Sequence, residues 1–300
     1  MLILKTIKHE TLWGGNRLET CSNNKNTKIG HLYSLVSNEE FESEILNGEF
    51  KGLTLGEFFK KNKHKYNLQN YRKFPFTISL TDASENLSIQ VHPNDKFVQA
   101  NLNMPHGKNE SWYFIEQPYS RKIYNGCKSN SIEELQHNIN TNNFKDIIDY
   151  LEVQPEDYVY VEAGTLHALS AGSLVYEIEE NCNITYRLYD FDRVDKDGNK
   201  RKLQIEDAIK TIDINLKSKA EPFACEKTER FYSTKLFKNT TNYTNKSNTI
   251  ECLTVIKGNS TIENFNIKQG STIILEPNEK IELGLSDFII ARPIVTKEDK

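Results

Sequence analysis

The feature that most constrains the fold of this chain is its long series of short segments rich in β-branched and aromatic residues. Turn-forming Gly, Pro, Asn or Asp residues bound each segment. Those before residue 192 read FPFTISLTDA, LSIQVHP, SWYFIE, DYVYVEAG, LVYEIEE and ITYRLYDF. Those after residue 249 read IECLTVIKG, STIENFNI, GSTIILEP, KIELG and DFIIARP. This pattern predicts short antiparallel strands, and therefore a mainly β fold arranged as a sandwich or a barrel.

Three helical stretches interrupt the strands. The first, TLGEFFKKN, has Thr54 as its expected N-cap with Glu57 three residues later. The second covers SIEELQHNINTNNFKDIIDYLEV with Ser131 as its cap, and the third lies near 204–213. We expect one domain over 1–220, which contains these helices, and a smaller β domain over 221–300. The stretch NTTNYTNKSN in the second domain has the composition of a surface loop.

Composition narrows the class of protein. The net charge of −4 over 300 residues gives no basic excess, which argues against a nucleic-acid partner. No apolar run approaches the roughly 20 residues of a membrane helix, so we expect no membrane association. The five cysteines form no C-x-x-C pair. This spacing supports neither a disulfide framework nor a thiolate zinc site, and it favours a reducing cytoplasm.

The segment LSIQVHPND raises the first question about function. In a strand, Ile89 and Val91 point to one face, whereas Gln90 and His92 point to the other. The apolar face is explained by burial in a core. The polar face is either solvated, as such faces usually are, or Gln90 and His92 share a ligand.

Two further residues extend this candidate site. Glu110 begins the strand ESWYFIE, and His167 lies in the turn EAGTLHAL. Together with Gln90 and His92 they make a mixed nitrogen and oxygen ligand set, which suits zinc, manganese, iron or cobalt better than calcium. Taken singly, residues of these kinds are more often exposed or hydrogen-bonded side chains than metal ligands. Spacing alone does not bring the four together, because they come from separate strands.

Four blocks in order, LSIQVHPND, GKNESWYFIE, VEAGTLHAL and NITYRLYDFDR, closely resemble the type I mannose-6-phosphate isomerases (phosphomannose isomerases) in their short bacterial form. LWGGNRL near the start and DKDGNKRKLQIEDAI resemble further stretches of that family. The resemblance runs from about residue 5 to 215 and is weaker after residue 220. It implies two cupin-type (jelly-roll) β-barrels with a small helical insertion, the second barrel being degenerate, and one zinc ion per chain.

The resemblance also implies roles for individual residues. Gln90, His92, Glu110 and His167 correspond to the zinc ligands. Three further residues correspond to catalytic positions, and these are Arg187 in TYRLYD, Lys108 two residues before the glutamate ligand, and Glu177 in LVYEIEE. Without the resemblance, Arg187 is explained as a surface ion pair with Asp190 or Glu177, Lys108 as a solvated charge and Glu177 as an exposed acid.

The implied reaction interconverts mannose 6-phosphate and fructose 6-phosphate through a cis-enediol. A Lewis-acidic metal orients the oxygens at C1 and C2, a positioned base moves a proton between these carbons, and a cation offsets the developing or phosphate charge. The expected partner is therefore a hexose 6-phosphate. Lys108 and Glu177 are both candidates for handling the proton.

Three positions depart from the family pattern. Ser79 takes the place of a lysine, His31 of a glutamate and Tyr33 of a tryptophan, all around the family's substrate pocket. Besides a diverged isomerase, these departures leave open an isomerase for another sugar phosphate and a catalytically inactive metal-binding cupin that binds a sugar phosphate. A metal-dependent oxidative cupin is a third class, which would require iron or another redox metal.

Overall fold

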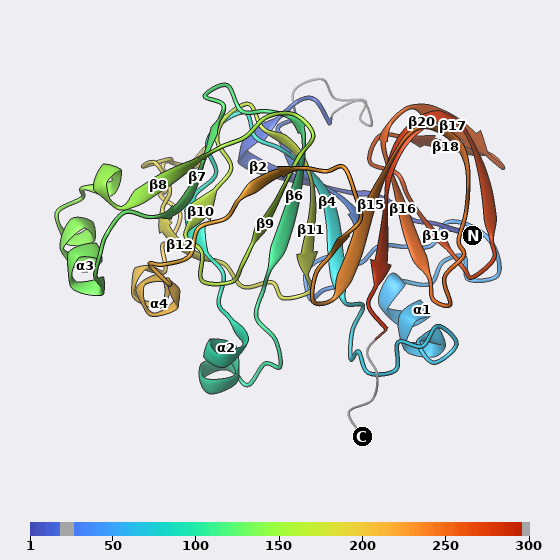
Figure 1. Cartoon of the computed structure of the whole chain (residues 1–300), viewed down its shortest axis with the longest axis horizontal. Helices are drawn as coiled ribbons and strands as arrows, with labels where there is room; N and C mark the ends of the chain where they lie inside the picture. Colours follow the sequence, from blue (N-terminus) through green and yellow to red (C-terminus); the bar gives the residue numbers. More distant parts are fainter. Residues whose placement is uncertain (19–26, 296–300) are drawn as a thin grey trace. The chain divides into compact units, whose positions relative to one another are not determined.

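The computed structural model describes residues 1–18 and 27–295, and they form mainly antiparallel sheet (Figure 1). Strands take up 43% of the structure and helices 12%. The predicted mainly β fold is therefore confirmed. None of the helices in the described ranges is long and apolar enough to cross a membrane. The described cysteines Cys127, Cys182, Cys225 and Cys252 are all free, and Cys21 lies outside the described residues.

The described residues contain four α-helices. Their bounds are α1 Leu55–Asn62, α2 Asp95–Leu102, α3 Ile132–Asn140 and α4 Ile205–Thr211. Thr54 and Glu57 form the predicted capping box at the start of α1, and Ser131 caps α3 through Glu134 N–H. Helix α2 was not predicted, because the residues after His92 suggest only the end of a strand; Asn94 is in fact its N-cap and accepts from Phe97 N–H.

The second predicted helix is too long. After α3, residues Phe144–Asp146 form one 3₁₀ turn, and Ile148–Glu152 form strand β8. Strand β8, IDYLE, is held by antiparallel pairing with residues 122–127, in which Leu151 lies opposite Ile123. That pairing joins separate stretches of the chain, so the local pattern does not reveal it.

The chain divides into two compact units, each described here by itself. The central unit comprises His9–His31 and Thr81–Pro222, and the terminal unit comprises Met1–Lys8, Leu32–Leu80 and Phe223–Lys300. Strands β2 (Ile7–Gly15), β3 (Ile29–Leu35) and β4 (Phe76–Asp82) each run from one unit into the other along the chain. The domain boundary at 220/221 stays a prediction.

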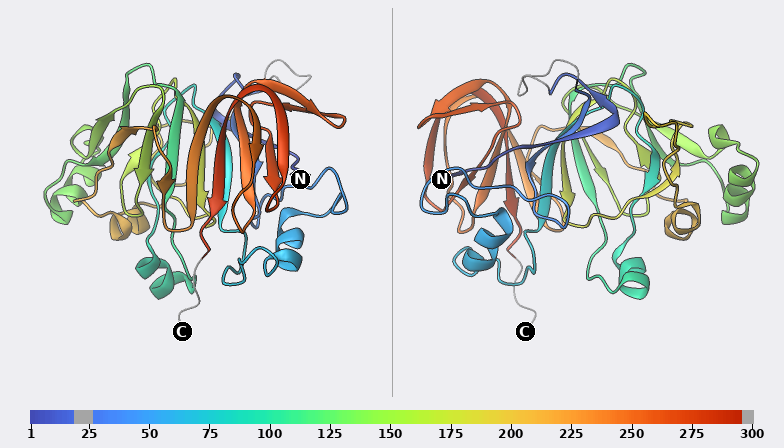
Figure 2. Two further views of the ribbon diagram at one scale, coloured as in Figure 1. Left: turned by 45° about the vertical axis from the view of Figure 1, so that its right-hand side comes forward. Right: turned by 180° about the vertical axis from the view of Figure 1, so that it is seen from behind.

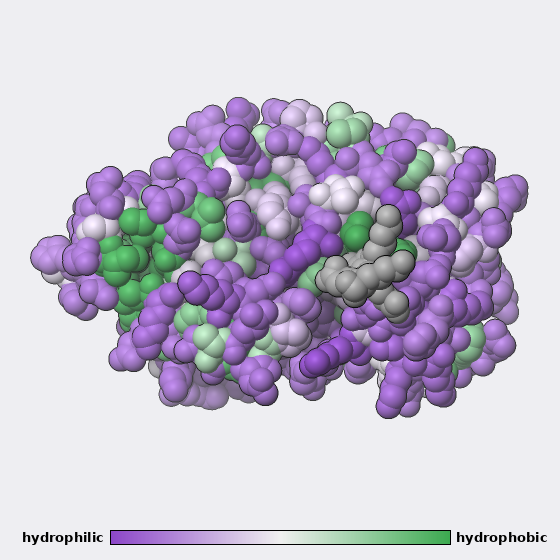
Figure 3. All heavy atoms as spheres, turned by 60° about the horizontal axis from the view of Figure 1, so that its bottom comes forward, coloured by the Kyte–Doolittle hydropathy of each residue, from purple (hydrophilic) through white to green (hydrophobic). Residues whose placement is uncertain are grey.

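Two sheets make the framework of the central unit. One has the order β12-β5-β10-β7-β8, and four strands of the other have the order β13-β9-β6-β11. The bounds are β5 Ile89–Val91, β6 Glu110–Glu116, β7 Lys122–Cys127, β9 Asp157–Val161, β10 His167–Ala168, β11 Leu174–Glu180, β12 Tyr186–Tyr189 and β13 Ala220–Pro222. An apolar core that includes Val91, Phe114 and Val159 fills this unit. Helices α3 and α4 lie together at one end of this unit, near an apolar area of surface in Figure 3.

The terminal unit contains a six-stranded sheet of order β1-β19-β16-β20-β15-β14 and the hairpin β17-β18. The bounds are β1 Leu2–Ile3, β14 Lys227–Thr228, β15 Tyr232–Thr244, β16 Glu251–Lys257, β17 Asn259–Ile262, β18 Phe265–Lys268, β19 Thr272–Leu275 and β20 Lys280–Pro293. Its C-terminal strands, orange and red in Figure 2, curve around an apolar core that includes Leu253, Val255, Phe288 and Ile290.

Candidate metal centre and catalytic residues

Strand β5 places three of the predicted residues on one face of its sheet. Gln90 is the Cα partner of His167 on β10 and of Arg187 on β12. Residues directly opposite each other on neighbouring strands share a face. The register therefore brings Gln90, His167 and Arg187 side by side, and His92 follows immediately after β5.

Two glycines allow the loops of the site to approach His92. Gly164, with φ +98, donates its N–H to the His92 carbonyl at 2.8 Å and so ties down the loop that leads to His167. A Cβ atom at Gly107 would lie 2.0 Å from the Pro93 carbonyl oxygen, so only glycine permits this approach. These contacts hold the segment that carries Lys108 and Glu110 against the one that carries His92.

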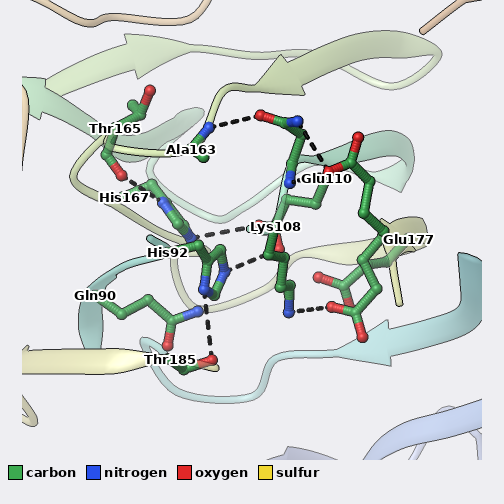
Figure 4. A network of polar contacts seen from close by, with 12 residues as sticks. Gln90, His92, Lys108, Glu110, Ala163, Thr165, His167, Glu177 and Thr185 are labelled. Carbon is green, nitrogen blue, oxygen red and sulfur yellow. Dashed lines mark hydrogen bonds and ion pairs between the residues drawn. The ribbon is translucent and has the colours of Figure 1, made fainter. Parts of the chain in front are cut away.

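The carboxylate of Glu110 lies between two imidazoles (Figure 4). Its Oε2 is 3.0 Å from His92 Nε2 and its Oε1 is 3.3 Å from His167 Nε2. Each of the three residues is only 1% exposed. One ligand atom from each lies within 4.8 Å of the others, an arrangement that can hold a metal ion.

The tautomers of both rings favour a cation at this point. His92 Nδ1 is 3.0 Å from the Ile184 carbonyl and His167 Nδ1 is 2.8 Å from the Thr165 carbonyl, and a carbonyl only accepts, so Nδ1 carries the hydrogen in each ring. Burial lowers the pKa of His92 to about 4 and also lowers that of His167, so both rings are neutral.

Each Nε2 therefore presents a lone pair to Glu110, and within the described part of the chain neither has a hydrogen-bond partner. Two lone pairs that face an anionic oxygen repel it. A divalent cation would satisfy all three groups, and backbone carbonyls that fix the other ring nitrogen are a usual support for histidine ligands.

The predicted fourth ligand is less well placed. Gln90 is half-buried, and its Oε1 accepts from Ser88 Oγ at 3.1 Å. In Figure 4 its amide lies beside His92. Its role as a ligand stays a prediction, which the shared face with His167 supports.

Lys108 is buried in a group of glutamates and is not a solvated charge. Its ammonium forms an ion pair with Glu179 and lies 3.6 Å from Glu110 Oε2. Burial alone would lower the pKa of Lys108, but Glu179, Glu110 and Glu177 outweigh burial and raise it above its ordinary range. Burial raises the pKa of Glu179 to about 7 against the opposing effect of Lys108.

Glu177 is likewise buried, at 7% exposure, and both of its oxygens are held. Oε1 accepts from Trp112 Nε1–H at 2.9 Å, and Oε2 accepts from the Thr81 hydroxyl at 2.7 Å. Burial, and then the nearby Glu110 carboxylate, raise the pKa of Glu177. His31 Nδ1 lies 2.9 Å from Thr81 Oγ1.

Arg187 carries a half-buried guanidinium whose Nε has no hydrogen-bond partner among the described residues. Burial, followed by the neighbouring Arg201, lowers its pKa. Asp190, which the sequence offered as a surface partner, instead pairs with Arg193 and Arg201. The guanidinium thus retains an N–H group that can bind an anion.

Sequence reasoning missed three residues of this cluster. Glu179 and Trp112 each lie two residues beyond a predicted site residue on the same strand, so the two-residue period of a strand places them on the same face and could have revealed them. Thr81 gave no such signal, because its contact depends on how separate strands pair.

The three departures from the family pattern fall in different places. His31 lies in the central unit, with its ring 5.0 Å from that of Trp13. Ser79 is buried on β4, and Tyr33 lies on β3 with its ring 4.9 Å from that of Phe41. The last two belong to the terminal unit.

Comparisons with known proteins find matches to mannose-6-phosphate isomerases. Residues 1–117 match the family model for the catalytic domain of type I phosphomannose isomerase. The chain is 32% identical over 214 residues to the mannose-6-phosphate isomerase ManA of Bacillus subtilis, which covers 71% of this chain and 68% of that protein. It is 31% identical over 223 residues to the mannose-6-phosphate isomerase of Streptococcus mutans, covering 74% and 70%. A crystal structure of the Bacillus subtilis mannose 6-phosphate isomerase superposes with a TM-score of 0.84 at 26% identity, over 97% of this chain and 99% of that one.

Proposed function

Because this chain belongs to the type I phosphomannose isomerases, we propose that it interconverts mannose 6-phosphate and fructose 6-phosphate through a cis-enediol. The observation that carries the proposal is the convergence of two imidazole lone pairs on the buried Glu110 carboxylate. That arrangement would be unfavourable in a protein that binds no cation at this point.

We assign His92, Glu110, His167 and Gln90 to holding one zinc ion. Neutral imidazole nitrogens with one carboxylate and one amide oxygen fit zinc in number and type. When bound, the ion would act as a Lewis acid toward the oxygens at C1 and C2 of the sugar.

We assign the proton transfer to Glu177. The aldose loses a proton from C2 and the ketose gains one at C1, so one base on one side of the enediol can do both. Lys108 is held as an ammonium by three glutamates and cannot accept a proton, whereas burial makes Glu177 a better proton acceptor than an exposed carboxylate. Lys108 would donate hydrogen bonds to the sugar oxygens.

Arg187 would offset negative charge on the substrate. Its guanidinium stays protonated, has an Nε–H to spare, and can bind an anionic oxygen pair through two parallel hydrogen bonds. The phosphate of a hexose 6-phosphate and an enediolate are both anions of this kind, and Arg187 shares a face with Gln90 beside the metal ligands.

A coupled assay tests this function. Protein of measured metal content is supplied with mannose 6-phosphate, and the fructose 6-phosphate formed is followed before chelation, after chelation and after zinc is restored. We expect turnover that chelation abolishes and zinc restores. The exposed His137 provides a matched control, because His137→Ala should leave turnover unchanged. Fully zinc-loaded protein that is silent on mannose 6-phosphate would contradict the proposal and favour the inactive or altered-specificity alternative.

A further inference from the structure

A chain of hydrogen bonds runs from His31 through Thr81 to Glu177, and each bond in it has a defined donor and acceptor. The Thr81 hydroxyl has one hydrogen and lies close both to Glu177 Oε2, at 2.7 Å, and to His31 Nδ1, at 2.9 Å. An ionised carboxylate can only accept, so the hydroxyl hydrogen points to Glu177. His31 Nδ1 must then carry a hydrogen and donate to Thr81.

The ring of His31 is held in place from both sides. It stacks on the ring of His9 at 5.9 Å and meets Trp13 edge-on at 5.0 Å. A Cβ atom at Gly30 would lie 2.7 Å from the Trp13 ring and 2.1 Å from Thr11 Oγ1, so the backbone beside His31 is packed as tightly as glycine allows. Burial, and then His9, lower the pKa of His31 to about 3, so the ring is neutral and has a single N–H.

From this geometry we propose that His31 is a positioning residue for the isomerase reaction, because it fixes the Thr81 hydroxyl so that Thr81 and Trp112 together lock the plane of the Glu177 carboxylate. The inference rests on the proposed function, in which Glu177 moves the proton. A carboxylate held at both oxygens keeps one orientation toward C1 and C2. His31 acts through Thr81 and not by contact with substrate.

Single substitutions test the chain. Histidine Nδ1 corresponds in position to the amide nitrogen of asparagine, whereas the glutamine amide reaches the position of Nε2. We therefore expect His31→Ala and His31→Gln to lower kcat about tenfold with KM within about twofold, and His31→Asn to recover most of the loss. Thr81→Val should behave like His31→Ala, and Thr81→Ser should behave like the unmodified protein. His31→Asn as slow as His31→Ala would overturn the proposal.

The double variant separates action through Thr81 from direct action on the substrate. If His31 acts only through Thr81, the variant carrying both His31→Ala and Thr81→Val is no slower than Thr81→Val alone. If the losses of kcat in the two single variants instead multiply in the double variant, His31 acts independently of Thr81. That result would contradict the hydrogen-bond chain. Thr254→Val is the matched control, because Thr254 is a fully buried threonine of the terminal unit whose hydroxyl is 2.8 Å from Thr272 Oγ1. Zinc content and thermal unfolding temperature are measured for every variant.

A second measurement tests the hydrogen-bond chain without an activity assay. Nitrogen NMR shifts of ¹⁵N-labelled histidine report which ring nitrogen carries the hydrogen. We expect the Nδ1–H form for His31 in the zinc-loaded protein, and a shift toward the Nε2–H form in Thr81→Val. An Nε2–H form in the unmodified protein overturns the hydrogen-bond chain. Absence of turnover in that protein, with Nδ1–H observed, would instead count against the proposed function alone.

Discussion

The two units use similar antiparallel sheets but fill their interiors with different chemistry. In the terminal unit the inward positions alternate as Leu253 and Val255 on β16 and as Phe288 and Ile290 on β20, all apolar and buried. In the central unit the same period on β6 places the Glu110 carboxylate beside the Trp112 ring. The chemistry of alternate residues, and not the sheet, therefore decides whether an interior only stabilises the fold or also binds a ligand.

The distribution of histidines makes the same contrast. Every histidine of the chain except His64 lies in the central unit, and residues 223–300 contain none. The central unit also buries Lys108 with Glu110 and Glu177. Buried charged and titratable groups cost free energy unless they are paired, so we expect the central unit to depend on its ligand for stability in a way that the terminal unit does not.

The largest expected effect comes from removing one imidazole. His92→Ala should abolish zinc binding and reduce turnover to the background of the assay, because Glu110, His167 and Gln90 leave the proposed site with only one of its two imidazoles. In zinc-free protein the same change should cost little stability, since it removes a lone pair that faces a carboxylate.

Metal analysis and thermal unfolding with and without zinc measure both effects. Zinc at 1,000 times its dissociation constant should stabilise the unmodified protein by about 4 kcal/mol and His92→Ala by none. A variant that still gains stability from zinc would break the contrast between the two units.

The next largest effect should come from a substitution that creates a cavity in the core of the terminal unit, and it should change stability alone. Phe288 is fully buried and stacks on Phe237 at 5.2 Å, so Phe288→Ala should lower the free energy of unfolding by about 3–5 kcal/mol. Urea unfolding measures the loss, and Phe265→Ala on β18, which removes a half-buried ring, should cost less. The folded Phe288→Ala protein should bind zinc normally, and a loss of zinc would show that the two interiors are not independent.

The smallest expected effect is the pH dependence of stability that His31 gives to the central unit. The pKa of His31 in the folded protein is about 3, below the ordinary value of about 6.5 for an unfolded chain. As pH falls from about 6.5, the unfolded state takes up a proton at this residue that the folded state refuses, so stability falls. Well below pH 6.5, His31 should contribute a loss of about 1.4 kcal/mol in the free energy of unfolding for each pH unit.

Urea unfolding of metal-free protein at pH 5 and pH 7 measures this contribution of His31. The comparison is with His31→Asn, which has no titrating group at residue 31. The unmodified protein should lose more stability than the variant on acidification. Equal losses of stability in the two proteins would contradict the assignment of a half-buried, neutral imidazole.

The sequence predicts the mainly β fold because the two-residue period of a strand is local information, and the same period placed Gln90 and His92 on one face. It does not predict contacts that depend on pairing between distant strands, and the link from His31 to Thr81 is one of these. Local cues also misled at NTTNYTNKSN, whose polar residues suggest a loop although residues 239–244 belong to strand β15. There the outward side of an exposed strand has the composition of a turn.

The register of β5 has a consequence for how the protein folds. This strand is only three residues long, yet it brings His167 and Arg187 together around Gln90 from distant parts of the chain. Contacts between residues far apart in sequence form slowly, and a slip of one residue would turn the whole set to the opposite face. The proposed metal centre can therefore assemble only once these pairings are complete. We therefore expect refolding protein to recover its zinc affinity only at the end of folding. The time course of zinc uptake would then report the rate of the last folding step.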